Sequence, residues 1–469
     1  MALSKIWAAF IIISIFAACL LILFTDGNQD IFNRMVVGKS GDTTHTRALD
    51  SATISADIMQ PLQSTKEYSK DNISYLKTAD GKYISYYRQR ADGIIATCKT
   101  AVDISINLIG IMALFMGFMR IAERAGGINL LSRIIGPFFS KLFPDLPRNH
   151  PAMGHMVMNF SANLLGLDNA ATPFGIKAME SLQELNPSNN TASNAQVMFL
   201  CLHASGLTLI PVSIIAIRSS LGAANPTDIF IPCMIATFAA TMAALFIVSF
   251  RQKINVFQPI ILLWVLSIAT VFATLVVYLA TLSAASVQSF SGVLSNGLIL
   301  LIFLLIIIGA LYKKTDIFDA FVEGAKGGFE TAVKIIPYLV GMLVAISMLR
   351  TSGVFDVVIG GMKQLFLAIG TDTRFVEGLP TALIRPLSGS GARGMMVDTI
   401  NAYGPESFAG RLSSILQGSS DTTFYVVAVY FGAVNINNTR YSIPVMLLAD
   451  LVGIITSISL CYLFFGNGA

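Results

Sequence analysis

Several ionisable and polar residues stand inside long apolar stretches of the chain, where they could bind a polar solute. Asp168 lies in the segment 163–173, which reads Asn-Leu-Leu-Gly-Leu-Asp-Asn-Ala-Ala-Thr-Pro. A second segment, 385–394, reads Arg-Pro-Leu-Ser-Gly-Ser-Gly-Ala-Arg-Gly. Charge inside a membrane is costly, so such residues usually pair with one another or border a polar pathway. The predicted solute-binding residues are Asn163, Asp168, Asn169, Thr172, His203, Ser205, Arg385, Ser388, Ser390, Arg393, Gln417, Ser419, Ser420, Asp421 and Thr422.

These residues also have structural interpretations. An aspartate beside a glycine often caps a helix, which is the alternative for Asp168. Arg385 could neutralise Asp168 or Asp421 in a structural ion pair. Hydroxyl groups also bond between membrane helices without any ligand, which is the alternative to lining a cavity for Ser388, Ser390, Ser419, Ser420, Thr422 and Thr423. Asp450, within the last apolar segment, is interpreted either as a proton carrier or as a hydrogen-bonding residue between packed helices.

No catalytic or metal-binding pattern stands out. His203 lies just before Ser205 in an apolar segment, where a packed histidine is more common than a ligand. His150 and His155 are five residues apart, which is poor spacing for one helical face, so we predict no metal site. Segment 388–394 resembles a phosphate-binding loop but lacks the Gly-x-x-x-x-Gly-Lys pattern. We therefore expect neither a cofactor nor an enzymatic activity.

The polar motifs are embedded in a chain with the composition of a membrane protein. It has 469 residues, 54% hydrophobic and 12% charged, and the charged share is about half the roughly 25% of soluble domains. Residues 6–24, 229–250, 260–280 and 293–312 contain no charge, and each is long enough to cross a hydrocarbon core. The net charge of +4 is small and dispersed, which argues against nucleic-acid binding.

One polar segment interrupts this pattern near the N-terminus. Residues 25–92 hold 18 of the 58 charged residues, nine of each sign. Lys5 precedes the first span, so the positive-inside rule predicts a cytoplasmic N-terminus and sends the polar segment across the membrane. The five cysteines never occur as Cys-x-x-Cys, and we expect them to pack as small apolar side chains.

The rest of the chain contains the same order of features twice. At an offset of 231 residues, Thr100-Ala-Val matches Thr331-Ala-Val, and Gly110 matches Gly341. Each half continues with an amphipathic stretch, an apolar segment interrupted by Gly and Pro, a span marked by polar residues and a final span that begins with Ile-Pro. This order predicts an internal duplication.

The distribution of charge predicts that the two halves are inverted. Residues 120–148 carry five Lys and Arg against two acids and are expected in the cytoplasm, whereas 350–377 carry three of each and are expected outside. We therefore predict an all-α polytopic membrane protein, an inverted-topology repeat with about nine crossings plus two re-entrant hairpins. Secondary transporters are often built in this way, with the solute site near the midplane between interrupted helices.

The motifs resemble those of a known family. Segment 163–173 is similar to spore maturation protein A, and segments 384–393 and 417–425 are similar to spore maturation protein B. The chain resembles a fused form of this family, and each half resembles a Gate, or nucleoside recognition, domain. The resemblance implies a bacterial inner-membrane protein, and the domain name suggests transport of small molecules.

The sequence thus predicts an inner-membrane secondary transporter or permease for a small polar solute, either nucleoside-like or anionic. The alternative is a non-transporting membrane protein that assists envelope or spore cell-wall maturation through its polar insert. The expected partners are membrane lipid and the solute, and the sequence leaves open a homo-oligomer and an envelope protein bound to the insert. The predicted regions are an N-terminal anchor at 1–24, an extracytoplasmic insert at 25–90, the first Gate repeat at 91–255, two linking helices at 256–315 and the second Gate repeat at 316–469.

Overall fold

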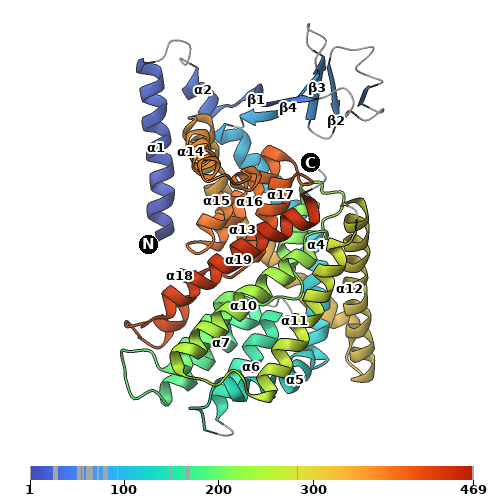
Figure 1. Cartoon of the computed structure of the whole chain (residues 1–469), viewed down its shortest axis with the longest axis vertical. Coiled ribbons are helices and arrows are strands. Elements are labelled where there is room, and N and C mark those ends of the chain that lie inside the picture. Colours follow the sequence, from blue (N-terminus) through green and yellow to red (C-terminus); the bar gives the residue numbers. More distant parts are fainter. Residues whose placement is uncertain are drawn as a thin grey trace.

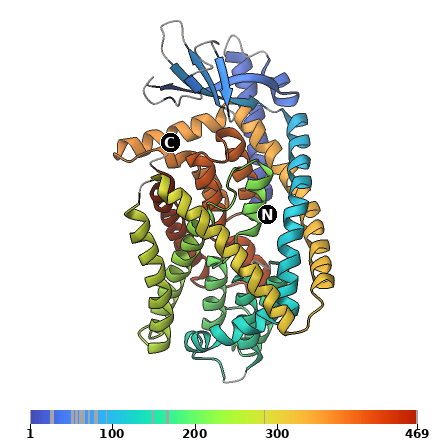
Figure 2. The same ribbon diagram turned by 90° about the vertical axis from the view of Figure 1, so that its right-hand side faces the viewer.

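The chain folds into a helical body with a small β-sheet at one end, as Figures 1 and 2 show. This computed structural model describes residues 2–24, 30–49, 54, 58–59, 67–70, 73–77, 83–91, 93–147, 150–164, 168–282 and 284–466. We call the end of the body that carries the sheet the sheet end and the opposite end the far end. The predicted all-helical membrane protein is confirmed for the body.

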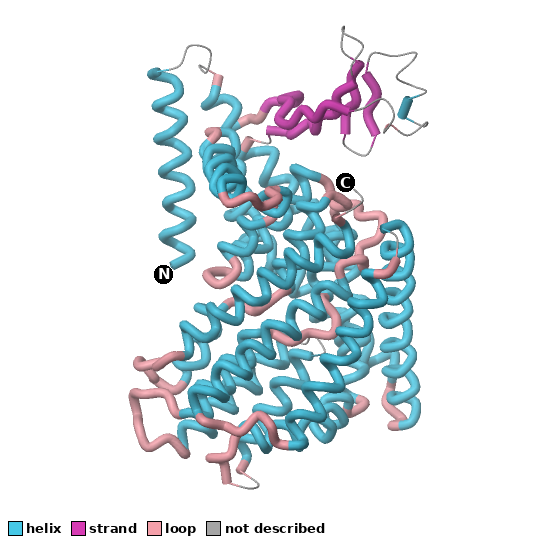
Figure 3. The backbone as a smooth tube through the Cα atoms, viewed as in Figure 1, coloured by secondary structure: helices cyan, strands magenta, loops and turns pink. Residues whose placement is uncertain are grey.

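The sheet lies within the predicted insert, and the sequence analysis did not anticipate its strands. Neighbouring strands are antiparallel in the order β1-β4-β3-β2. A Cβ added to Gly93 would lie 2.3 Å from the backbone nitrogen of Gly38, so the chain enters and leaves the sheet at one place (Figure 3). The elements of this region are α2 (Ile31–Val36), β1 (Lys39–Leu49), β2 (Glu67–Lys70), β3 (Ile73–Lys77) and β4 (Tyr83–Ala91).

Continuous helices long and apolar enough to cross a membrane number seven among the described residues. Two of them, α11 and α12, connect the two halves of the chain, and their exposed leucines are suited to face lipid. The seven helices are α1 (Ala2–Phe24), α4 (Ile94–Arg124), α10 (Phe230–Gln252), α11 (Pro259–Ala280), α12 (Ala284–Tyr312), α13 (Ile317–Thr351) and α19 (Ser442–Phe465).

Two further crossings are made by interrupted helices, one in each half. In the first half α8 stops and α9 continues, and in the second half α17 stops and α18 continues into a π-helical turn, η3. Counted as one crossing each, they roughly fit the prediction of about nine crossings when added to the seven continuous helices. Their bounds are α8 (Asn194–Ser205), α9 (Val212–Ser220), α17 (Phe408–Gly418), α18 (Thr423–Val426) and η3 (Val427–Phe431).

Each half also contains a helical hairpin that does not cross the body. The hairpin α6–α7 lies in the lower part of Figure 1, toward the far end, and α15–α16 lies in the upper part, toward the sheet end. The amphipathic helices α5 and α14 lie at the far end and the sheet end, respectively. The bounds are α5 (Gly127–Leu142), α6 (Pro151–Leu164), α7 (Asp168–Glu184), α14 (Val354–Ala368), η2 (Arg374–Glu377), α15 (Leu379–Ile384) and α16 (Gly389–Tyr403).

The two halves run in opposite directions, as predicted. The end of α4 meets the start of α13, where Arg120 and Glu323 form an ion pair of 2.5 Å. The helix backbones touch, because a Cβ on Gly328 would lie 2.7 Å from the backbone of Ala113. Equivalent helices of the two halves therefore pack antiparallel, which is the arrangement of an inverted repeat.

The register of the repeat differs from the sequence prediction at one place. Gly126 and Gly353, both with a left-handed backbone (φ of 83° and 74°), follow α4 and α13. They are 227 residues apart, whereas Gly110 and Gly341 are 231 apart. The four missing residues correspond to about one helical turn, so the constant offset does not extend to the ends of these helices.

Candidate functional site

The hairpin α6–α7 is joined by a buried asparagine. Asn159, in α6, has no exposed surface, and its Nδ2 donates a hydrogen bond of 2.7 Å to the carbonyl of Ala171 in α7. Asn163 follows one turn later and lies on the same face of the helix. The first hairpin therefore presents two carboxamides to the interior of the body.

His203 connects the first interrupted helix to these carboxamides. Its Nδ1 lies 2.8 Å from Nδ2 of Asn163 and 3.0 Å from Oδ1 of Asn159. The ring of Tyr430, from the second half, packs edge-on against the imidazole with 4.8 Å between centroids. The helix α8 ends at Gly206, whose φ of 64° favours glycine. The imidazole is thus fixed by groups from both halves.

Arg385 lies at the tip of the second hairpin and reaches the second interrupted helix. Its Nε donates to the carbonyl of Ser420 at 2.9 Å, and Nη2 donates to the same oxygen. Its Nη1 lies 3.4 Å from Oγ1 of Thr422. A Cβ on Gly389 would lie 2.7 Å from this Oγ1, so the close approach of hairpin and helix requires glycine. Ser388 caps α16 by accepting a backbone hydrogen bond of 2.9 Å.

A backbone hydrogen bond joins the two helix breaks. The amide of Asp421 donates to the carbonyl of Ala204 at 2.8 Å. The Asp421 side chain is 40% exposed, and its Oδ1 accepts a 2.6 Å hydrogen bond from the amide of Thr422. Its Oδ2 lies 3.8 Å from Nε2 of His203, a distance that permits electrostatic attraction but is too long for a hydrogen bond. The interruptions of the two halves therefore face each other.

Gln417 in α17 corresponds to His203 in α8, since each stands two residues before a serine at the helix end. Gln417 Nε2 donates to the carbonyl of Gly389 at 3.3 Å, so it binds the hairpin of its own half, as His203 does. Ser205 and Ser419 each donate to a carbonyl of their own helix, at 2.7 and 3.0 Å. The hydroxyl groups of these two predicted residues thus bond to carbonyl groups in the last turns of their own helices.

A buried carboxylate adjoins the second break. Asp450, in α19, is 4% exposed, and its Oδ2 accepts a hydrogen bond of 2.7 Å from Oγ1 of Thr423. The side chain of Ser420 lies beside it. We call the polar residues around the two breaks the central cluster, which consists of Asn159, Asn163, His203, Arg385, Ser420, Asp421, Thr422, Thr423, Tyr430 and Asp450.

Sequence comparisons with known proteins show which family this chain belongs to. A family model described as "Gate: Nucleoside recognition" matches residues 105–224 and 332–437, one segment in each half. Spore maturation protein B of Bacillus subtilis (strain 168) is 49% identical over 174 residues, which cover 37% of this chain and 96% of that protein. Spore maturation protein A of the same organism is 42% identical over 156 residues, which cover 33% of this chain and 80% of that protein. The chain belongs to the spore maturation protein A/B family. No solved structure matches it.

In this member of the spore maturation protein A/B family, several predicted site residues come together and others do not. Thr172 lies beside the hydroxyl of Tyr430, and Ser390 Oγ lies 3.2 Å from Ser388 Oγ. Arg393 is half-buried in α16. The helix α7 begins at Asp168, but the side chains of Asp168 and Asn169 lie outside the described residues. The predicted residues found in the central cluster are Asn163, His203, Arg385, Ser420, Asp421 and Thr422.

Two residues of the central cluster were not singled out from the sequence of this family member. Asn159 could have been found, because it precedes Asn163 by four residues and so shares its helical face. Tyr430 gives no such signal, since it reaches His203 from the other half of the chain. Thr423 and Asp450 were considered but not included in the predicted site. Thr423 follows Thr422 directly in the sequence, whereas only the fold shows that Asp450 lies next to the second break.

A buried ion network joins the halves between the central cluster and the sheet end. Arg218, in α9, has no exposed surface, and its Nη2 lies 2.9 Å from Oδ1 of Asp228. The other oxygen of Asp228 accepts a hydrogen bond of 2.7 Å from Nε of Arg411 in α17, and Arg411 also pairs with Glu406. This network fixes the second half against the first at the sheet end.

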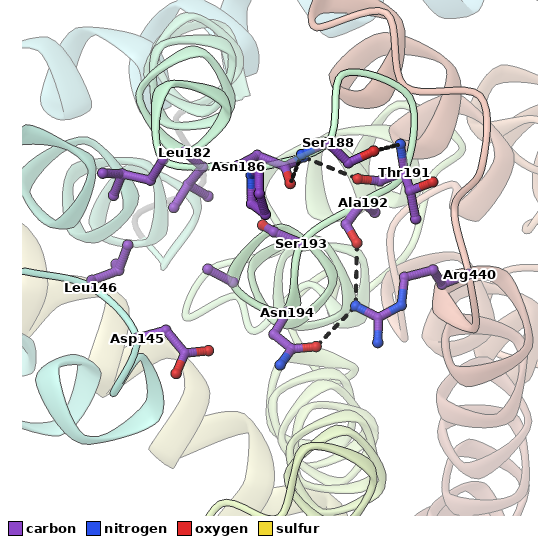
Figure 4. A pocket seen from close by; sticks show the side chains of 13 residues that line it. Asp145, Leu146, Leu182, Asn186, Ser188, Thr191, Ala192, Ser193, Asn194 and Arg440 are labelled. Carbon is purple, nitrogen blue, oxygen red and sulfur yellow. Dashed lines mark hydrogen bonds between the residues drawn. The ribbon is translucent and has the colours of Figure 1, made fainter.

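The far end contains a cavity of about 400 Å³ where loops of the two halves meet. Arg440, from the second half, donates to the carbonyl of Ala192 at 3.2 Å and to Oδ1 of Asn194 at 2.9 Å (Figure 4). Asn186 and Ser193 also line the cavity and are hydrogen-bonded within the loop between α7 and α8. None of the predicted site residues lines it.

Across the described residues, no three side chains of His, Cys, Asp or Glu are grouped so that they could hold a metal ion. The five cysteines are free thiols, and Cys201, Cys233 and Cys461 are buried. The central cluster itself offers hydrogen-bonding groups and the ionisable side chains of Arg385, Asp421 and Asp450.

Proposed function

We propose that this protein is a secondary transporter or permease for a small polar solute, nucleoside-like or anionic, and that the solute binds at the central cluster. The observation that carries the proposal is the hydrogen bond between Asp421 and Ala204, which brings together the helix breaks of two inverted halves. Interrupted helices of inverted repeats form the solute sites of many secondary transporters.

The backbone around the breaks supports this proposal. Where a helix stops inside a membrane, its amide and carbonyl groups lose their partners, so such breaks border protein, water or a ligand. The N-terminal end of α16 lies beside Arg385, and helix N-termini favour negative charge. An anionic or strongly hydrogen-bonding group of a solute fits this surrounding.

Uptake into proteoliposomes tests the proposal. Purified full-length protein is offered radiolabelled nucleosides and nucleoside monophosphates, and Arg385→Ala is compared with the wild type. We expect uptake of at least one class and a loss of about tenfold or more in the variant, because a hydrogen bond to a charged group contributes roughly 1.5–3 kcal/mol.

Arg133→Ala is the matched control, since Arg133 is exposed in α5 and lies outside the central cluster. Its uptake should equal that of the wild type. Uptake that both variants leave unchanged would contradict a solute site at Arg385. If neither class of compound enters, the proposed transport of a nucleoside-like or anionic solute is contradicted.

A second candidate function rests on the sheet. A four-stranded sheet at one end of the body is a module that the helical repeat does not need, and it could bind an envelope protein during envelope or spore cell-wall maturation. Deletion of residues 39–91, with α1 retained, distinguishes the two functions. Loss of a co-purifying envelope protein with unchanged uptake supports docking, whereas loss of uptake with retained partners contradicts it.

The proposal extends to setting and partners. We propose that the protein acts without catalysing a reaction, in the bacterial inner membrane, with its N-terminus in the cytoplasm and the sheet outside. Membrane lipid and the solute are its proposed partners, with no role for nucleic acid, and association of several copies is compatible with the exposed apolar faces of α11 and α12.

A further inference from the structure

Asp450 is a buried acid whose direct partners are hydroxyl groups. It lies within α19, a continuous membrane-spanning helix, and is 4% exposed. Thr423 donates to its Oδ2 at 2.7 Å, and the hydroxyl of Ser420 lies beside it. Among the described residues, none forms an ion pair with Asp450. An unpaired carboxylate is costly to bury as an anion, and protonation removes this cost.

Within the described part of the chain, two charged groups act on Asp450, and both lie at the second break. Arg385, at the tip of the α15–α16 hairpin, and Asp421, between α17 and α18, act on it electrostatically in opposite senses. From α8, His203 lies 3.8 Å from Asp421. The helices α10, α11 and α12 also pack against α19, and their apolar spans contain no charged residue. The charge on Asp450 is thus set by the groups of the central cluster.

The other half of the repeat shows that the fold does not require an acid at this position. Asp450 stands six residues after Pro444 in α19, and Phe238 stands six residues after Pro232 in the equivalent helix α10. Phe238 is buried and packs against Phe272 of α11. An apolar side chain therefore serves the packing of this helix in the first half, and the carboxylate is a feature of the second half alone.

We propose that Asp450 is a proton-binding site that couples passage of the solute to movement of a proton, an inference that rests on the proposed function. The carboxylate takes one proton from water on one side of the membrane and becomes neutral. Arg385 then faces no negative charge at Asp450 and can bind an anionic group of the solute. Release of the proton on the other side restores the carboxylate. One proton thus accompanies the anionic group bound at Arg385, so a singly charged solute crosses the membrane without net charge.

Infrared spectroscopy of the purified full-length protein tests the proton site without any solute. Spectra are recorded from about pH 5 to about pH 9, a range in which buried acids are known to titrate. The wild type should show a carbonyl-stretching band of a protonated carboxyl group that grows as the pH falls. The band should be missing in Asp450→Asn and return at a shifted frequency in Asp450→Glu.

Asp398→Asn is the matched control. Asp398 lies in α16, outside the central cluster, and forms an ion pair of 2.5 Å with Arg350 of α13. The band should persist in it. Thr423→Val removes the donor to Asp450 without removing the acid, so the band should remain and its titration should move. A wild-type minus Asp450→Asn spectrum that does not change with pH overturns the proposal, because the acid then keeps one protonation state and only holds helices together.

Transport in vesicles tests the coupling itself. In liposomes with an imposed pH gradient, wild-type uptake of a nucleoside monophosphate should be several-fold faster with the acidic side outside than without a gradient. Asp450→Asn should show the same uptake in both conditions. If the titrating band is present but the gradient has no effect on the wild type, coupling is contradicted. If the band is present and no compound enters, the proposed function fails while the proton site stands.

Discussion

At the scale of single residues, some members of the central cluster can be recognised from the sequence, whereas Tyr430 is recognised only from the fold. Asp168, Arg385 and Asp421 stand out in the sequence because ionisable residues are rare in apolar segments. Arg385 and Asp421 do lie at the second break. The role of Tyr430 could not be predicted, because its contact with His203 depends on how the two halves meet.

Loss of Arg218 should cost much stability. It has no exposed surface and bonds to Asp228 at 2.9 Å and to the carbonyl of Pro405 at 2.9 Å. In Arg218→Met, Asp228 loses one of its two cationic partners among the described residues and keeps Arg411, so we expect the free energy of unfolding to fall by about 3–5 kcal/mol. Thermal or denaturant unfolding in detergent measures the change.

Arg133→Met is the control for this prediction, because Arg133 is exposed and surface substitutions usually change stability by about 0.5 kcal/mol or less. Equal effects of the two substitutions would show that the buried ion network contributes nothing to holding the halves together at the sheet end.

At the scale of elements, breaks and close contacts are encoded by glycine and proline. The interrupted segments were predicted from these residues, and the structure has hairpins or helix ends there. The strands were not predicted, because β1 contains only two aliphatic residues, Ala48 and Leu49, and so lacks the alternating pattern that indicates a half-buried strand.

The end of α8 requires glycine because its backbone is left-handed and because it lies close to the second break. A pair of glycine variants separates these two effects. Gly206 has a φ of 64°, and a Cβ there would lie 3.1 Å from the amide of Asp421, whereas Gly222 has a φ of 78° and open space around it. Both Gly→Ala variants carry the cost of a left-handed residue, about 1–2 kcal/mol.

Gly206→Ala should also disturb the contact between the two breaks. We expect it to unfold at a lower temperature than Gly222→Ala and to lose uptake, while Gly222→Ala retains uptake. If the two variants have the same unfolding temperature and the same uptake, the contact between the two breaks tolerates an added methyl group. The breaks would then be less closely joined than described.

The packing of α4 against α13 offers a second matched pair. A Cβ on Gly328 would lie 2.7 Å from the backbone of Ala113, whereas one on Gly327 would meet only the flexible end of Met116 at 3.6 Å. Gly328→Ala should therefore lower the unfolding temperature by separating the helices. Gly327→Ala should leave it unchanged or raise it, since alanine stabilises a helix by roughly 0.5–1 kcal/mol over glycine. The opposite order would contradict the antiparallel contact.

At the scale of the whole molecule, inverted architecture was predictable because charge and repeated order are properties of long segments. Residues 120–148 and 350–377 were assigned to opposite sides from their charges, and their helices α5 and α14 lie at opposite ends of the body. A meeting near the midplane was expected between the interrupted segments 163–173 and 385–394, which form the two hairpins. The bond from Asp421 to Ala204 joins two other interruptions and was beyond prediction. Such a bond depends on the packing of every helix between the two residues.

The central claim is that the meeting point of the two halves is open to water inside the membrane. Single cysteines at Asp421 and Leu451, in a variant whose five native cysteines are replaced by alanine, are treated with a charged thiol reagent that cannot cross the membrane. Asp421, 40% exposed at the break, should react when replaced by cysteine. Leu451, 49% exposed and next to Asp450 in α19, is expected to face lipid and should not react. If the cysteine at position 421 does not react when the reagent is added from either side of the membrane, the account is contradicted.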